Sequence, residues 1–188
     1  HAETLSLTYD ANGNLITGDG KFREYNSLNQ LWKVYNGTNT SVLLEEYLFH
    51  PVEERIVMKK VYSAGVLSET VYYVDENFVR VVNTSGTYDF TYVKHEGQLV
   101  AQLQSGTKIF MHSDHEGSTS VVTNASGAVL ENTLYSPHGE ILSGGTVSRF
   151  DSEGKEFDSL VGDYDFNFRK FCVQFGIFCQ PDTLIQNV

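Results

Sequence analysis

The stretch Tyr9-Asp10-Ala11-Asn12-Gly13-Asn14-Leu15 joins an aromatic residue, a polar turn and the start of an apolar strand. Asn-Gly tolerates the positive φ angles that a tight turn needs, so the motif is typical of a β-hairpin. The motif recurs at loose intervals of 16 to 26 residues. Clear copies begin at Tyr25, Tyr92 and Tyr135, and weaker copies begin at Tyr47, Tyr73 and Phe110. This self-similarity predicts a repeat structure.

The segments between the turns have the alternation of β-strands. In 69–74 and 78–82 the apolar side chains would favour one face of a sheet. A single hairpin cannot bury that face, whereas stacked hairpins can. We therefore expect an all-β structure of consecutive antiparallel hairpins in a curled sheet. Residues 29–34 and 53–60 have weak helical patterns, but the repeat phase favours strands or turns there.

Composition narrows the classes of function. The 188 residues carry a formal net charge of −11, which disfavours binding to nucleic acid. No segment approaches the roughly 20 apolar residues that a membrane helix needs, so no membrane insertion is expected. No signal peptide is visible, and the start at His1-Ala2-Glu3 is typical of a mature product or a trimmed chain.

The pattern changes from about Ser148 onward. Charged and aromatic residues crowd together there, and the regular hairpin pattern stops. Terminal caps are expected of repeat structures. We therefore divide the chain into a repeat sheet, 1–147, and a non-repetitive C-terminal plug, 148–188.

Two longer segments carry more specific motifs. The first is Phe110-Met111-His112-Ser113-Asp114-His115-Glu116-Gly117-Ser118. It resembles the aromatic-x-His-x-Asp-His-Leu-Gly-Ser segment of a known family, the Rhs/YD-repeat proteins, which include Tc-toxin C components and teneurins, with Glu116 in place of Leu. The second segment resembles the Rhs-associated core. It contains Arg149-Phe150, Gly154-Lys155-Glu156, Asp158, Gly162, Tyr164, Phe166, Arg169, Phe171, Gly176, Phe178 and Pro181-Asp182-Thr183. Cys172 and Val173 replace the family's Asp-Pro, and Ile177 replaces its Arg.

The resemblance implies a β-cocoon, or shell, that encloses a C-terminal toxin or other cargo. This chain would be a C-terminally truncated part of that shell, secreted or at the cell surface. Its partner would be the rest of its own polypeptide, and it would have no enzymatic activity and no cofactor. The alternative is an extracellular adhesion or glycan-binding module that contacts a cell-surface protein or a glycan, as the likeness to teneurins permits.

The resemblance also implies aspartate-dependent self-cleavage in a longer parent protein. The family uses an Arg thirteen residues before a first Asp, and Arg169 and Asp182 have that interval. A second Asp is expected beyond Val188, so Arg169 and Asp182 would be a catalytic half-site. Paired carboxylates can divide the roles of acid and base, which a single carboxylate cannot do.

Other polar residues have two or more interpretations. His112, Asp114, His115 and Glu116 offer metal-ligating side chains, but a polar turn explains them as well, and we expect no metal. Cys172 and Cys179 are interpreted as buried thiols, a local disulfide or a zinc site that needs two further ligands, with no His nearby. Asn-x-Ser/Thr triplets, which are compatible with glycosylation, begin at Asn36, Asn39, Asn83 and Asn124.

Overall fold

The computed structural model describes residues 6–53 and 55–182, and these residues form three antiparallel sheets. The largest sheet has 13 strands, and each strand pairs with the one that follows it in the chain. Its strands are β1 (Thr8–Tyr9), β2 (Leu15–Thr17), β3 (Lys21–Tyr25), β4 (Leu31–Asn36), β5 (Leu43–Phe49), β6 (Ile56–Ser63), β7 (Val66–Tyr73), β8 (Phe78–Asn83), β9 (Gly86–His95), β10 (Gln98–Gln104), β11 (Thr107–Ser113), β12 (Thr119–Asn124) and β13 (Val129–Asn132). The predicted succession of hairpins is confirmed.

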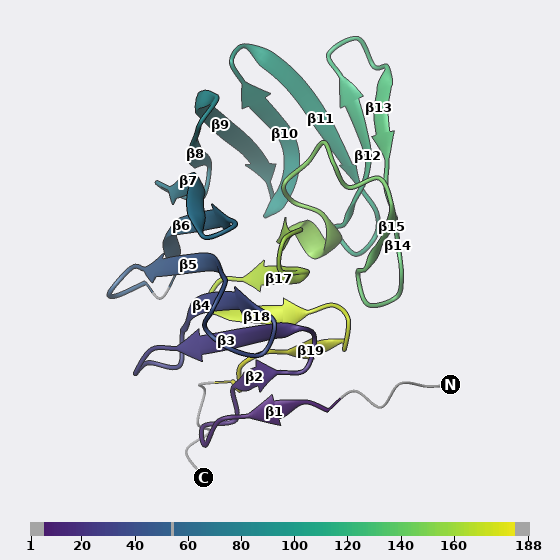
Figure 1. Ribbon diagram of the computed structural model, residues 1–188. Helices are drawn as coiled ribbons and strands as arrows, with labels where there is room; N and C mark the ends of the chain where they lie inside the picture. Colours follow the sequence, from purple (N-terminus) through teal and green to yellow (C-terminus); the bar gives the residue numbers. More distant parts are fainter. Residues whose placement is uncertain (1–5, 54, 183–188) are drawn as a thin grey trace.

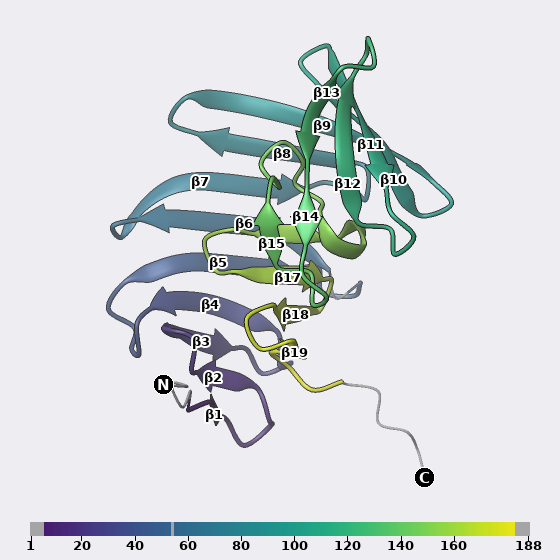
Figure 2. The same cartoon turned by 90° about the vertical axis from the view of Figure 1, so that its right-hand side faces the viewer.

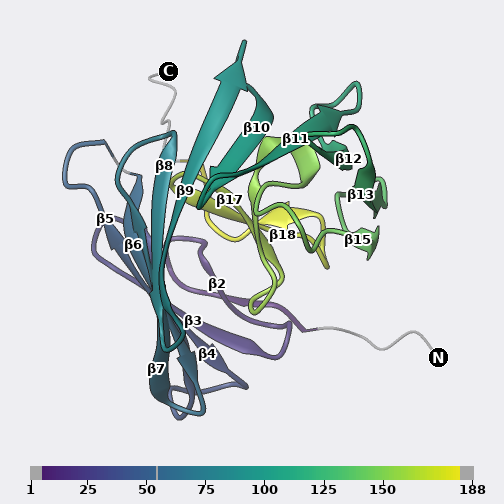
Figure 3. The same cartoon turned by 90° about the horizontal axis from the view of Figure 1, so that it is seen from above.

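The large sheet curls along its length. From β1 to β8 the strands stack as one wall, and from β9 to β13 the wall turns and arches over the remaining chain (Figure 1). The view from above shows the large sheet curving around the later part of the chain, which lies on its concave side (Figure 3). The segments with weak helical patterns lie in this wall, because β4 begins at Leu31 and β6 begins at Ile56. No helix among the described residues is long and apolar enough to cross a membrane.

One five-residue turn, residues 10–14, explains why a small polar residue follows the aromatic residue of the motif. The Asp10 Oδ1 atom accepts the backbone N–H groups of Asn12 at 2.9 Å and Asn14 at 2.8 Å. The Asp10 N–H donates to the Asn14 carbonyl at 3.0 Å. Gly13 has φ of 84°, a conformation that glycine adopts without steric cost. The side chain of Asp10 therefore closes the hairpin.

The same turn recurs at residues 26–30, 114–118, 124–128 and 136–140. In each turn the side-chain oxygen of the first residue, an Asp, Asn or Ser, accepts the N–H of the fifth residue. The fourth residue has a positive φ angle in every case. These fourth residues are Asn29, Gly117, Gly127 and Gly139. The chain thus repeats a local hydrogen-bonding unit more faithfully than it repeats a sequence.

The large sheet ends at β13, and two smaller sheets follow it. The first pairs β14 (Leu134–Tyr135) with β15 (Ile141–Ser143). The second follows the 3₁₀ turn η1 (Ser152–Gly154) and consists of β16 (Glu156–Asp158), β17 (Asp163–Phe166), β18 (Arg169–Cys172) and β19 (Ile177–Phe178). The repeat sheet thus ends before Ser148, and the residues after it form a separate four-stranded sheet. In β16 and β17 charged residues alternate with aromatic ones, and this hid their period of two.

The four-stranded C-terminal sheet, β16–β19, lies on the concave side of the large sheet (Figures 2 and 3). The apolar core joins the two sheets. Phe150 packs edge-on against buried Tyr92 of β9, with ring centroids 4.8 Å apart. Val161 belongs to the buried cluster around Leu31, and Cys172 belongs to the cluster around Leu15. The C-terminal segment is therefore part of the folded core.

The five-residue turns predict an effect of substituting Asp114. Asp114→Ala removes the oxygen that accepts the N–H groups of Glu116 and Ser118, both at 2.9 Å. We expect a loss of about 1–2 kcal/mol in the free energy of unfolding. His115 lies at the same turn with its side chain 89% exposed, so His115→Ala should change stability by less than about 0.5 kcal/mol. Urea unfolding measures both, and equal effects of the two substitutions would contradict the proposed role of the turn.

Candidate functional site

The C-terminal sheet turns its charged face toward the large sheet. Its strand register aligns Glu156 with Asp165 and Lys170, and it aligns Asp158 with Asp163 and Cys172. Aligned residues share one face, and residues two apart share it as well. Every residue of this set is buried or half-buried. The opposite face carries Phe157, Tyr164, Phe166, Phe171 and Phe178. The face that packs against the large sheet is therefore charged, and the aromatic residues occupy the other face, where Tyr164 is also buried.

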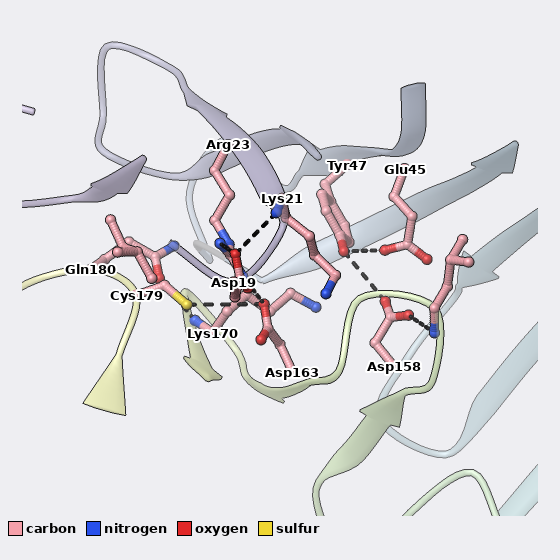
Figure 4. Close-up of polar contacts among 12 residues, drawn as sticks. Asp19, Lys21, Arg23, Glu45, Tyr47, Asp158, Asp163, Lys170, Cys179 and Gln180 are labelled. Atoms are coloured by element: carbon pink, nitrogen blue, oxygen red, sulfur yellow. Dashed lines mark hydrogen bonds and ion pairs between the residues drawn. The ribbon is translucent and has the colours of Figure 1, made fainter. Parts of the chain in front are cut away.

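The large sheet meets this face with a buried lysine. Lys59 on β6 aligns with Tyr47 on β5 and with Val71 on β7, so its side chain belongs to the inward face of the wall. The Lys59 Nζ atom lies 3.1 Å from Asp158 Oδ2, 3.9 Å from Glu45 Oε1 and 4.0 Å from Glu156 Oε1. Its side chain is 8% exposed. We call Lys59, Glu45, Tyr47, Glu156 and Asp158 the Lys59 cluster. Figure 4 labels its members Glu45, Tyr47 and Asp158.

Protonation differs between the two adjacent carboxyls of the Lys59 cluster. Burial and repulsion by Asp158 raise the pKa of Glu45 well above its usual value. Burial alone would also raise the pKa of Asp158, but attraction to Lys59 and a hydrogen bond from Glu45 hold it below its usual range. The shared environment therefore favours the protonated form at Glu45 and the ionised form at Asp158. The Tyr47 hydroxyl donates to Glu45 and lies 3.3 Å from Asp158 Oδ2.

Glu156 connects the Lys59 cluster to the linker that leads into the C-terminal sheet. Its Oε1 atom accepts hydrogen bonds from Arg149 at 2.5 Å and from the Tyr73 hydroxyl at 3.0 Å. Burial would raise the pKa of Glu156, but Arg149 and Lys59 lower it below its usual value. The carboxylate thus bridges β7 of the wall, the linker and β16.

A second buried ion pair, the Arg23 cluster, lies on the neighbouring part of the wall (Figure 4). The Arg23 guanidinium makes two hydrogen bonds to Asp19, at 2.9 Å and 2.5 Å, and a third to Asp163 Oδ2 at 3.1 Å. Its side chain is fully buried. Burial raises the pKa of Asp163, although Arg23 opposes this shift. Arg23 therefore links β3 of the large sheet to β17 of the C-terminal sheet.

Both cysteines lie beside the Arg23 cluster. Cys172 and Cys179 are buried free thiols, which agrees with the first of the three interpretations. A hydrogen bond with the Cys172 thiol, together with burial, raises the pKa of Cys179 well above its usual value. The Cys179 Sγ atom lies 3.9 Å from Asp163 Oδ2. Asp163 is thus a neighbour of the cysteines that their spacing in the sequence does not indicate.

Arg169 and Asp182 come together as a pair, with Arg169 Nη1 3.4 Å from Asp182 Oδ2. The guanidinium also lies 3.9 Å from the centre of the Phe178 ring. The Asp182 side chain is 48% exposed and that of Arg169 is 21% exposed. Thr183 and the residues up to Val188 lie outside the described residues. A catalytic role for Arg169 and Asp182 therefore stays a prediction.

The polar segment 112–116 forms a turn. β11 ends at Ser113 and Asp114 opens a five-residue turn, so His112, Asp114 and Glu116 do not share one strand. The His112 Nε2 atom lies 3.0 Å from Thr123 Oγ1 on β12. The structure supports the interpretation of this segment as a polar turn.

The Asn-x-Ser/Thr triplets lie at hairpin ends. The side-chain oxygens of Asn39, Asn83 and Asn124 each accept the N–H of the residue two positions later. Asn36 is exposed at the end of β4. Their positions fit surface turns, and glycosylation stays a prediction.

The comparisons with known proteins agree with this architecture. The teneurin YD-shell family matches residues 1–148. The chain belongs to this family. Teneurin-1 of Gallus gallus and Teneurin-1 of Homo sapiens are each 29% identical over 142 residues, which cover 73% of this chain. The chain spans about 5% of the length of these curated relatives.

Solved toxin structures share the fold of this YD-shell chain. A crystal structure of TcdB2-TccC3-TEV aligns with a TM-score of 0.74 at 18% identity and covers 93% of this chain and 10% of that one. A Photorhabdus luminescens Tc holotoxin pore aligns with a TM-score of 0.78 at 18% identity and covers 94% and 9%. The predicted Rhs/YD-repeat resemblance is confirmed. A shell-like structural role follows, and it agrees with the expectation that the chain is not an enzyme.

The Lys59 cluster predicts a large effect of Lys59→Met. The substitution leaves the Asp158 charge buried without its cation, which typically costs about 3–5 kcal/mol of stability. Lys60→Met on the same strand is the matched control, because Lys60 contacts Glu46 at 3.4 Å and its side chain is 34% exposed. The control should lose less than about 1 kcal/mol. Urea unfolding of both variants checks the prediction, and a Lys59→Met variant as stable as Lys60→Met would refute it.

Proposed function

We propose that this chain is a segment of a secreted or cell-surface shell that encloses a C-terminal toxin or other cargo of its own polypeptide. One observation carries the proposal: the charged C-terminal sheet is buried against the inner wall of a curled sheet. Lys59 contacts Asp158 across this boundary, and Arg23 contacts Asp163. The inside of the curl thus already holds later segments of the same polypeptide.

The two predicted domains have different roles in the proposed shell. Residues 1–147 supply the wall, and the C-terminal part from residue 148 acts as the plug. The aromatic face of the plug turns away from β3–β7 and lines a pocket of about 640 Å³ together with Ser120 of β12, Tyr135 and His138. Its aromatic lining residues are Phe166, Phe171 and Phe178. Apolar side chains at such a pocket offer a surface on which enclosed polypeptide can pack.

The test of enclosure uses the longer parent protein. Limited proteolysis of the native parent should leave any region after residue 188 intact, whereas the denatured parent is cut throughout. Lys59→Met should expose that region to protease by weakening the contact between wall and plug, and Lys60→Met should not. Cleavage of the region at equal rates in native and denatured parent would overturn the proposal. Selective binding of the isolated chain on a glycan array would instead favour the adhesion or glycan-binding alternative.

Self-cleavage of the parent has its own test. We expect Asp182→Asn, which keeps the side-chain shape and removes the charge, to leave a folded and uncleaved parent. Asp165→Asn is the matched control, because Asp165 is a carboxylate of the same sheet that pairs with Lys170. The readout is the fragment pattern on a denaturing gel. Normal cleavage of the Asp182→Asn parent would show that Asp182 is structural, and the 188-residue chain should cleave in neither form.

A further inference from the structure

Three metal-ligating side chains meet beneath the inner wall of the shell. The Sγ atoms of Cys172 and Cys179 and a carboxylate oxygen of Asp163 all lie within 4.8 Å of one another. These residues are 1%, 0% and 1% exposed, respectively. Within residues 6–53 and 55–182, this is the one group of three or more Cys, His, Asp or Glu side chains with such geometry.

Rigid elements hold all three side chains. Asp163 and Cys172 are directly paired across β17 and β18. Cys179 directly follows β19, and its N–H donates to the Lys170 carbonyl at 2.7 Å. Its own carbonyl accepts the N–H of Leu15 on β2 at 2.8 Å. The ligand atoms are therefore positioned by the fold, as a metal site requires.

A second observation points to a ligand at this position. Asp163 Oδ2 accepts a hydrogen bond from Arg23 at 3.1 Å, but Asp163 Oδ1 is buried without a hydrogen-bond partner. An unpartnered carboxylate oxygen in the interior is costly. The buried carboxylate beside two thiols thus has coordination capacity that no protein donor uses.

We propose that Cys172, Cys179 and Asp163 bind a Zn²⁺ ion. Binding replaces the two thiol protons by one dication, so two protons leave and the net charge of the buried cluster does not change. Two thiolates at about 2.3 Å and a carboxylate oxygen at about 2.0–2.2 Å are ordinary zinc ligands, and water takes the fourth position. Arg23 orients Asp163 from outside the site, as groups beyond the direct ligands commonly do.

Strand register argues against a disulfide between the same cysteines. Cys172 is paired directly with Ile177 on β19, and Cys179 follows two residues later, just past the end of that strand. Cys172 and Cys179 are therefore diagonal neighbours and do not face each other directly. Such diagonal positions are typically about 7–8 Å apart, beyond the usual reach of a disulfide. Thiolates that share a tetrahedral zinc need to approach only to about 3.8 Å. The spacing therefore suits an ion between the sulfur atoms.

The experiment uses the full chain, purified with a non-thiol reductant and no chelator. Elemental analysis should find about one Zn²⁺ per chain. Replacement of the zinc by Co²⁺ should produce the near-ultraviolet charge-transfer absorption of cobalt–thiolate bonds. A folded chain that neither retains Zn²⁺ nor gives this absorption would overturn the proposal. So would a mass spectrum of the chain, purified without reductant, that shows the two cysteines bonded to each other.

Variants assign the ligands. Cys172→Ala and Cys179→Ala should each weaken Zn²⁺ binding by at least about 100-fold. Asp165 is a half-buried carboxylate outside the group, so Asp165→Asn should bind as the unsubstituted chain does. Unchanged affinity in either folded cysteine variant would contradict the assignment. If a cysteine variant does not fold, the cobalt spectrum of the unsubstituted chain decides, because its charge-transfer absorption reports sulfur ligands directly.

Discussion

Carboxylates that face the inner wall of the shell set the main constraint on this structure. Asp158, Asp163 and Glu156 are almost completely removed from water, and an isolated buried carboxylate is far too costly to persist. The wall supplies the compensating positive charges through Lys59 on β6 and Arg23 on β3. Arg23 also pairs with Asp19 on the wall, but the hydrogen bonds from Lys59 to Asp158 and from Arg23 to Asp163 cross the boundary between the two sheets. Placement of the plug on the wall is therefore dictated by charge matching as well as by apolar packing.

Such contacts contribute more to specificity than to net stability. Desolvation offsets most of the attraction within a buried ion pair, whereas loss of one partner is strongly destabilising. The Lys59 and Arg23 clusters thus penalise any shifted position of the C-terminal sheet, in which a charge would lack its partner. Apolar contacts, such as Phe150 against Tyr92, stabilise the correct position. A shell closed in this way tolerates one arrangement of its plug.

The sequence predicted the hairpins because their turns are local. Asp10 and Asn26 act on backbone groups within four residues, so a short motif contains all the necessary information. The inner site was missed because its partners are distant in sequence: Lys59 and Asp158 are 99 residues apart. The sequence did contain one signal of this site: the alternation of the strands places some charged residues on the face that is expected to be buried. Only the three-dimensional structure shows which carboxylate each cation meets.

Native-state hydrogen exchange tests most directly whether plug and wall fold as one unit. If the buried charge pairs couple the two sheets, the backbone amides of β17 and β18 should open with the same free energy as those of β5–β7. Denaturant should lower both opening free energies together. Rapid exchange throughout β17 and β18, while the wall stays protected, would show that the plug is only loosely docked and would contradict the account.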